Sequence, residues 1–234
     1  MPYFMYGLSD GGMWILTIIA AIWAMIASAR VNSTFKKYSA MFNSRGYTGQ
    51  RCAEALLRSA GIYDVRVERV SGNLTDHFDP KAKVIRLSDT VFDSNSVAAI
   101  GVAAHEAGHA IQHNVGYFPI KIRQAIIPVC QIGSNLAMPL VLLGIFIGAT
   151  GLSEIGLILF SLSALFQLVT LPVEFNASRR ALSFLEQGAG LGEEEMRGAK
   201  KVLSAAAMTY VAALAVALAN LLRLVAIVNN SRRD

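Results

Sequence analysis

Four long apolar stretches constrain the fold of this chain more than any other feature. They lie at about residues 12–29, 125–150, 152–173 and 205–228. Each approaches or exceeds the roughly 20 apolar residues that a helix needs to cross a bilayer. The hydrophobic content of 54% and the mean hydropathy of +0.46 are too high for an ordinary soluble domain of 234 residues. The sequence therefore predicts a mainly α membrane protein with about four transmembrane helices.

Two of these stretches carry polar residues. The second contains two prolines and three polar side chains, Pro128, Pro139, Gln131, Ser134 and Asn135. This composition predicts a kinked helix that packs against protein rather than lipid. Asn220 and Arg223 interrupt the fourth stretch, which is therefore the weakest of the four candidate spans.

The first stretch has features of both a signal peptide and a membrane anchor. Ala27-Ser28-Ala29 loosely fits a small-residue cleavage site, but no Lys or Arg precedes Met13. Trp14 and Trp23 suit an anchor that is retained in the membrane. We therefore expect residues 1–30 to be a retained transmembrane anchor.

The positive charges are distributed as topology signals. Most of the 21 Lys and Arg lie between Arg30 and Arg123, and a second group lies between Arg179 and Lys201. Because Lys and Arg are enriched in cytoplasmic loops, both regions are predicted to be cytoplasmic. The net charge of +5 is thus explained without nucleic acid as a partner.

This topology places the N-terminus outside and turns the second and third helices outside near Gly151. Arg232 and Arg233 conflict with it, because they would also lie outside. A final helix that bends back or lies in the interface would remove the conflict. Five parts are predicted: an anchor (1–30), a cytoplasmic domain (31–124), a transmembrane hairpin (125–173), a cytoplasmic segment (174–204), and a C-terminal membrane helix with its tail (205–234).

The predicted cytoplasmic domain combines helices with short strands. Thr48 can cap a helix that runs to Ala60, and Gly61 can end it. Alternating apolar and polar residues over 64–70 and 83–87 predict two or three strands. An exposed strand edge can hold an extended peptide by backbone pairing, and the segments predicted to do so are the Ile85 strand and Leu74–Phe78.

His105-Glu106-Ala107-Gly108-His109 is the most informative motif, because HExxH on a helix is the signature of a catalytic zinc site. We predict one helix over Ala98–His113. Residues four apart share a helix face, so His105 and His109 can bind one metal ion while Glu106 is free to move a proton. A structural metal site and a solvated surface are the alternative interpretations.

A catalytic zinc takes three protein ligands, so these histidines need a partner. His113 continues the spacing but lies roughly 12 Å along a straight helix from His105, too far to share an ion. The longer HExxHxxGxxH motif fails at Gln112 and Val115.

Glu174 is the better candidate for the third ligand. The hairpin of the second and third helices returns the chain to the membrane surface that carries the HExxH helix, and Glu174 follows it directly. The alternative is that Arg179 or Arg180 neutralises this carboxylate.

The oxyanion of an amide hydrolysis needs a hydrogen-bond donor, and Tyr210 and His77 are candidates by residue type. A packed tyrosine in a membrane helix and a capping or surface histidine are the alternatives.

Several stretches together resemble the YugP-type neutral zinc metallopeptidases of bacterial membranes. They are Thr75–Pro80, Arg86–Ser88, Val97–His113, Leu171–Ser178 and Ala205–Tyr210. The resemblance spans nearly the whole chain. It implies His105, His109 and Glu174 as ligands of one zinc ion, Glu106 as catalytic base, and a place in the bacterial plasma membrane.

The chain is more distantly similar to the HtpX-type and CAAX prenyl proteases, in which the later motif reads ExxxD. Ser178 stands where that Asp would be. This departure removes a carboxylate that could hold a ligand histidine, although Ser178 can still form a hydrogen bond there.

The leading hypothesis is a multi-pass membrane zinc endopeptidase whose small α+β, zincin-like domain faces the cytoplasm. It would cleave membrane-associated or partly unfolded polypeptides. A narrower protease acting on lipid-modified or signal-derived peptides, and a non-catalytic protein with a structural zinc site, are the alternatives. A zinc transporter is disfavoured, because Arg223 is the only ionisable residue in the middle of a span.

Overall fold

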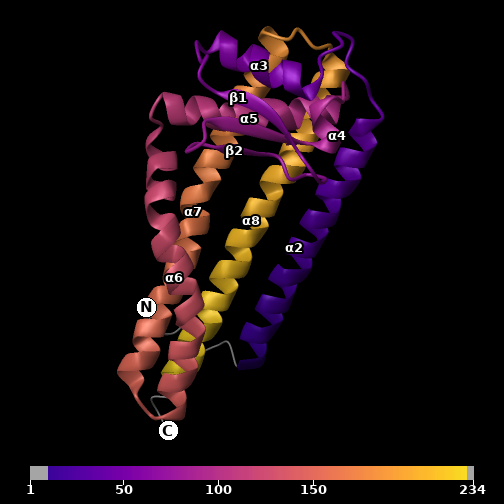
Figure 1. Cartoon of the computed structure of the whole chain (residues 1–234). Coiled ribbons are helices and arrows are strands. Elements are labelled where there is room, and N and C mark those ends of the chain that lie inside the picture. Colours follow the sequence, from indigo (N-terminus) through magenta and orange to yellow (C-terminus); the bar gives the residue numbers. More distant parts are fainter. Residues whose placement is uncertain (1–9, 231–234) are drawn as a thin grey trace. The chain divides into compact units, whose positions relative to one another are not determined.

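The computed structural model describes residues 10–230, which form a mainly helical chain with one small sheet (Figure 1). Its elements are α2 (Asp10–Ser39), α3 (Gly49–Ser59), β1 (Arg66–Val70), β2 (His77–Asp79), β3 (Val84–Ser88), α4 (Asp89–Phe92), α5 (Val97–Asn114), α6 (Phe118–Phe146), α7 (Thr150–Gln187) and α8 (Glu193–Asn230). Of these, α2, α6, α7 and α8 are long and apolar enough to cross a membrane. The predicted helical class and its four candidate spans are confirmed.

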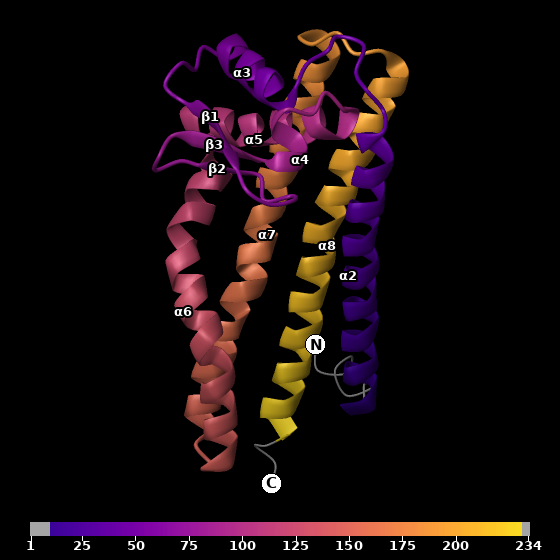
Figure 2. The same ribbon diagram turned by 45° about the vertical axis from the view of Figure 1, so that its right-hand side comes forward.

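Figure 2 shows the four long helices and the small sheet from a second side. The chain divides into two compact units. The helical unit comprises residues 1–27, 122–171 and 209–234, of which the structure describes 10–27, 122–171 and 209–230. The sheet unit comprises residues 28–121 and 172–208. The helices α2, α7 and α8 are each divided between the two units. The helical unit also contains most of α6, and the sheet unit contains the sheet, α3, α4 and α5.

In the sheet unit, the local signals of the sequence act as predicted. The Thr48 hydroxyl accepts a hydrogen bond from the amide of Arg51 at the start of α3. Ala60 caps the other end, and Gly61 follows with a φ of +71°, a conformation that favours glycine. Caps that satisfy free backbone groups explain why both helix ends were readable from sequence.

The sheet has the strand order β1-β3-β2, with β3 parallel to β1 and antiparallel to β2. Ile85 pairs with Val67 on one side and with Phe78 on the other. The prediction of the Ile85 strand as a peptide-binding edge is therefore wrong, because its hydrogen-bonding groups are used on both sides. The alternative segment contributes His77 and Phe78 to β2, which lies at an edge of the sheet.

The core of the sheet unit surrounds α5. It joins this helix to α3, β3 and the adjoining parts of α7 and α8 through fully or nearly fully buried side chains, including Leu56, Leu87, Ile100, Leu185 and Leu203. Burial of such a cluster is the main favourable term in folding, so α5 is fixed on several sides.

Residues 174–204 form the adjoining ends of α7 and α8 and the short connection between them. Val173, Ala177, Ala181 and Leu185 recur every fourth residue and are fully buried. This single apolar stripe continues α7 well beyond its apolar span.

In the helical unit, α6 and α7 pack closely through glycines. A Cβ at Gly156 would lie 2.7 Å from the carbonyl oxygen of Ala137, and the Ser153 hydroxyl donates to the carbonyl of Val141. The turn between the helices lies at residues 147–149, slightly before the predicted position near Gly151. Gly148, with a φ of +71°, makes this turn.

The interruptions of α8 are accommodated locally. The Asn220 amide donates to the carbonyl of Val216, and the guanidinium of Arg223 lies 4.2 Å from the ring centroid of Trp14. A cation over an indole face is a stabilising arrangement. The helix is continuous to Asn230, while Arg232 and Arg233 lie outside the described residues.

One face of α6 packs against α7, as the sequence predicts, through the buried residues Ala137 and Val141, which lie against Gly156. Gln131, Ser134 and Asn135 lie on an exposed face of the same helix. Pro128 and Pro139 lie inside a helix that continues through both positions.

Candidate metal centre

α5 places the two histidines of the sequence motif side by side. Its N-cap Ser96 accepts a hydrogen bond from the amide of Ala99, and the helix runs to Asn114, as the sequence predicts to within a residue or two. His105 and His109 lie one turn apart, with ring centroids separated by 4.7 Å. Their ring planes are nearly perpendicular, at 83°.

α7 brings Glu174 to these histidines from a distant part of the sequence. Its Oε2 lies 3.2 Å from Nε2 of His105 and 3.6 Å from Nε2 of His109. The ligand atoms of the three residues all lie within 4.8 Å of one another. The Glu174 side chain is 3% exposed. The three predicted ligands therefore form one cluster that could hold a metal ion.

The remaining ring nitrogen of each histidine has a neutral partner. Nδ1 of His105 lies 3.1 Å from the hydroxyl of Ser178, and Nδ1 of His109 lies 3.0 Å from Oε1 of Gln112. Ser178 thus forms the hydrogen bond that its position in the sequence allowed. Both contacts leave Nε2 of the ring directed toward Glu174. Hydrogen bonds of this kind, to the ring nitrogen that does not bind the metal, fix the orientation of histidine ligands.

Gln112 selects the tautomer of the neutral His109 ring. Its amide nitrogen donates to the carbonyl of Val173 at 2.8 Å and to Oδ1 of Asn176 at 3.0 Å, so its oxygen faces the imidazole. An amide oxygen only accepts, and Nδ1 of His109 must therefore carry the hydrogen. The lone pair of Nε2 is left available for a metal.

Arg180 has a different role from the one considered for it. Its Nε donates to Oδ1 of Asn176 at 2.9 Å, while the Glu174 carboxylate lies against the two imidazoles. The guanidinium thereby supports Asn176, which in turn accepts from Gln112.

The small residues of the motif allow α7 to approach α5. A Cβ at Gly108 would lie 2.7 Å from the carbonyl oxygen of Ala177, closer than real Cβ atoms come to other heavy atoms. Ala107 and Ala177 are both fully buried. The glycine is therefore required for the helix contact that carries Glu174 to His105.

The carboxylates of Glu106 and Asp76 are close enough to influence one another electrostatically. Glu106 is 9% exposed, and Asp76 accepts hydrogen bonds from the backbone amide and hydroxyl of Ser88. Burial raises the pKa of Asp76, and the charge of Glu106 raises it further. The structure thus adds an acidic neighbour to the predicted base.

The other predicted residues are not among the three that could hold a metal. His77 is on the edge strand β2, exposed, with Nδ1 2.8 Å from the carbonyl of Thr75 and Nε2 3.4 Å from Arg86. The ring of His113 makes an edge contact with Phe78 at 6.0 Å and lies outside the three-residue cluster, in agreement with its exclusion as a ligand. Tyr210 belongs to α8 within the helical unit.

Sequence reasoning missed Gln112 and Asp76 as parts of this environment. Gln112 lies three residues after His109 and is a polar residue with no exposed surface. That spacing puts it on the face of the histidine, which was the available signal. No local sequence pattern pointed to Asp76 as a neighbour of Glu106, because its approach depends on how the loop before β2 folds.

The donor set suits zinc. Two imidazole nitrogens and one carboxylate oxygen are a common ligand set of catalytic zinc sites. The amide oxygen of Gln112 keeps His109 in the metal-binding tautomer, and the Ser178 hydroxyl, which can donate or accept, holds the ring of His105 in place. The structure therefore defines a helical protein with membrane-length helices and a His-His-Glu cluster able to hold a metal.

Comparison with known proteins identifies the family. Residues 13–229 match the family described as "Putative neutral zinc metallopeptidase", and the chain belongs to it. It is 47% identical over 219 residues to the "Putative membrane protease YugP" of Bacillus subtilis (strain 168), covering 94% of this chain and 97% of that protein. No solved structure matches the chain. The resemblance found in the sequence is confirmed.

Proposed function

We propose that this protein is an integral membrane zinc metalloendopeptidase that hydrolyses peptide bonds in membrane-associated or unfolded polypeptides. The observation that supports this most directly is the convergence of Nε2 of His105, Nε2 of His109 and the carboxylate of Glu174, with Glu106 adjacent in α5. The family and the name of the Bacillus relative point to the same activity.

His105, His109 and Glu174 would hold one zinc ion. When bound, zinc supplies a Lewis acid that lowers the pKa of water toward neutrality and polarises the scissile carbonyl. Ser178 and Gln112 hold the two imidazoles, and Gln112 also bonds to the carbonyl of Val173, the neighbour of the third ligand.

Glu106 is the group that moves the proton. It follows a ligand directly, is largely buried and has a carboxylate free of the His-His-Glu cluster. It accepts the proton of the attacking water and passes it to the leaving amine, which a carboxylate in this place can do in both directions. Tyr210 and His77 remain the candidate donors to the oxyanion.

β2 provides a means of holding the substrate. It is an edge strand, and Phe78 within it contacts His113 on α5, the helix that carries the metal ligands. An extended peptide can pair with the backbone of such an edge. The excess of Lys and Arg in residues 30–123 supports a site on the cytoplasmic side of a bacterial plasma membrane.

Comparison of the wild-type protein with Glu106→Gln tests the proposal. We expect the variant to keep one zinc per chain and to cleave casein about 100-fold or more slowly, because the base is lost but the ligands are not. Zinc content is measured by elemental analysis and cleavage by release of labelled peptides. Glu68→Gln, which changes a half-exposed carboxylate that pairs with Arg66 in β1, is the matched control and should retain full activity.

Equal cleavage by wild type and Glu106→Gln would end the peptidase proposal. A protein that binds zinc but cleaves nothing in either form would support the alternative of a structural zinc site.

A further inference from the structure

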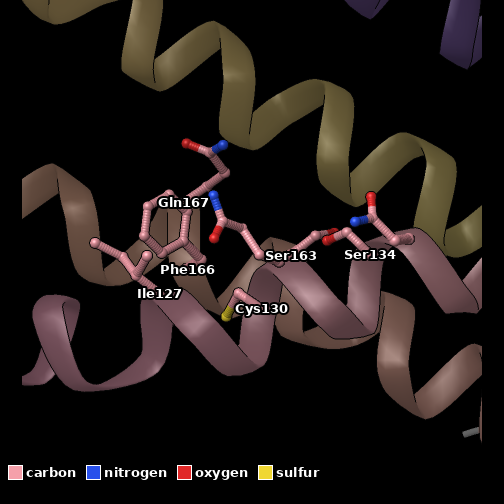
Figure 3. A pocket seen from close by; sticks show the side chains of 8 residues that line it. Ile127, Cys130, Ser134, Ser163, Phe166 and Gln167 are labelled. Atoms are coloured by element: carbon pink, nitrogen blue, oxygen red, sulfur yellow. The ribbon is translucent and has the colours of Figure 1, made fainter.

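The helical unit contains a second concave site, between α6 and α7 (Figure 3). Its volume is about 440 Å³, within the range of small-molecule and peptide pockets. The lining residues are Ile127, Cys130, Gln131, Ser134, Asn135, Ser163, Phe166 and Gln167. All belong to helices that are apolar enough to cross a membrane.

Five of the eight lining residues have amide or hydroxyl side chains, and none is charged. Gln131 and Asn135 lie one turn apart on α6, and Gln167 faces the same pocket from α7. Figure 3 shows the side chains of Cys130, Ser134, Ser163 and Gln167 among those that line the pocket. A site without Lys or Arg does not suit a phosphate, and one without Asp or Glu does not suit a cation.

Four of the six lining side chains that can form hydrogen bonds are available to a ligand. The Cys130 thiol donates to the carbonyl of Leu162, and the Ser163 hydroxyl donates to that of Phe160. Within residues 10–230, by contrast, no hydrogen bond joins the side chains of Gln131, Ser134, Asn135 or Gln167 to other groups. Three amides and one hydroxyl are thus open to another molecule.

The backbone of α6 adds an acceptor. A proline has no N–H, so Pro139 cannot donate to the carbonyl of Asn135 four residues earlier. A carbonyl without its helical partner therefore lies at a residue that lines the pocket.

Polar groups in a bilayer are costly unless they find a partner. An amide moved from water to an apolar medium without a hydrogen bond loses the bonds that it made with water and gains none in return. Such residues in membrane helices face a protein partner or a polar cavity. Since this face is exposed on α6, the chain itself does not supply the partner.

We propose that this pocket binds the backbone of a locally unwound stretch in a membrane-inserted segment of the substrate. The inference rests on the proposed peptidase function and narrows its substrate class to polypeptides with interrupted membrane helices. Side-chain amides donate and accept in the same way as peptide groups do. In a regular helix the backbone N–H and C=O groups are bonded to one another and are not available to these amides. A stretch broken by Gly-Pro leaves some of these groups without a helical partner.

The site also lies on a helix that the metal centre uses. Gln167 precedes Glu174 in the continuous helix α7, so one element carries both the pocket residue and the third metal ligand.

The test compares three substrates in proteoliposomes. Two are single-span reporters with the same juxtamembrane cleavage sequence, one with a Gly-Pro break in its span and one with an uninterrupted leucine span. The third is casein, which reports on the catalytic centre alone. The test variant is the triple Gln131→Leu, Asn135→Leu, Gln167→Leu, which removes the three amides without placing polar groups in the bilayer.

We expect the wild type to cleave the broken reporter about twentyfold faster than the uninterrupted one, the factor given by three membrane hydrogen bonds of ordinary strength. The triple variant should lose this preference while keeping its zinc and its casein cleavage. A matched control, Ile132→Leu with Leu136→Ile and Leu168→Ile, changes exposed neighbours on the same helices and should keep the preference.

If the wild type cleaves casein, the peptidase function stands, and three results would then overturn the inference alone. They are equal rates for both reporters in the wild type, an unchanged preference in the triple variant, and loss of cleavage of all three substrates by a triple variant that still holds zinc. A wild type that cleaves none of the three would overturn the peptidase function and the inference together.

A photo-crosslinking amino acid at position 166 gives a readout independent of cleavage. In the Glu106→Gln background it should capture the broken reporter. Capture of a second copy of this chain in its place would show that the pocket is an oligomer contact and overturn the inference.

Discussion

At the scale of single residues, Gln112 connects the two helices of the metal centre. One side chain accepts from His109 of α5 and donates to Val173 and Asn176 of α7. It is fully buried, so no solvent competes for these bonds. Gln112 thus holds the ligand His109 directly, and it holds the ligand Glu174 indirectly through the backbone carbonyl of Val173.

We expect Gln112→Leu to weaken zinc binding about 10- to 100-fold, the usual effect of losing a hydrogen bond behind a metal ligand. Competition with a chromophoric chelator measures the affinity. His113→Leu, a change one residue further along the same helix, should leave the affinity unchanged because His113 is outside the cluster. Equal losses in both variants would show that the effect comes from helix stability and not from the hydrogen bond.

Zinc binding should also depend on pH through His109. Burial lowers the pKa of His109, but its hydrogen bond with Glu174 and the charges of Glu106 and Glu174 outweigh burial and hold this pKa above 6.5. Zinc needs the neutral imidazole, so the proton competes with the metal below the raised pKa.

As the pH is lowered, the apparent zinc affinity should therefore begin to fall while the pH is still above 6.5. Below the raised pKa, it should drop by about tenfold per pH unit for this proton. Chelator competition over a pH series from about 6 to about 9 measures the fall. An affinity that stays constant over this range would contradict the assignment of His109 as a ligand.

At the scale of elements, the contact between α5 and α7 decides whether the site exists. The backbones meet at Gly108, where a side chain would collide with the carbonyl of Ala177. Glu174 and Ser178 flank that alanine in α7, and both contact His105. A displacement of α7 at this point moves a metal ligand and its supporting hydroxyl together.

Gly108→Ala should lower stability by about 1–3 kcal/mol, the usual cost of overpacking, and weaken zinc binding as well. Gly101→Ala is a matched control in the same helix, because the nearest atom to its added Cβ is 3.9 Å away. The control should gain up to about 1 kcal/mol from better helix propensity. Denaturant unfolding and chelator competition measure the two effects, and a Gly108→Ala protein as stable as the control would refute the collision.

At the scale of the whole molecule, bound zinc would link α5 to α7 and stabilise the folded sheet unit. Ligands that bind only the native state stabilise it by about 2.7 kcal/mol at a hundredfold excess over Kd. We expect the melting temperature of wild type and Glu106→Gln to rise with zinc and to fall again with a chelator.

Glu174→Ala should show little or no such rise, since the cluster then offers two ligands. Differential scanning fluorimetry in detergent follows all three proteins. A full equivalent of zinc and a normal rise in Glu174→Ala would show that the third ligand is another residue.

Local rules account for the parts of the fold that the sequence predicted. The four spans follow from length and hydropathy, α3 follows from Thr48 and Gly61, and α5 follows from Ser96 and an alanine-rich run. Each of these signals acts within a few turns of helix, so a single sequence is sufficient to read it.

Long-range pairing was less readable. The alternation at residues 83–87 indicated a strand but not its place in the sheet, and β3 lies between two partners. The polar face of α6 indicated a partner but not which one, and it lines a pocket that the chain leaves open. Strand order and the coverage of a helix face depend on residues far away in the sequence.

The sequence by itself determined a helical protein with four membrane-length stretches, a paired-histidine motif on one helix and Glu174 as the best third ligand. Tertiary structure alone decided that Glu174 meets both imidazoles, that Gln112 and Ser178 hold the histidines, and that Gly108 lets the helices approach. The physical reason is range: caps and hydropathy act between neighbours, whereas a metal centre requires atoms from two helices to converge within a few ångströms.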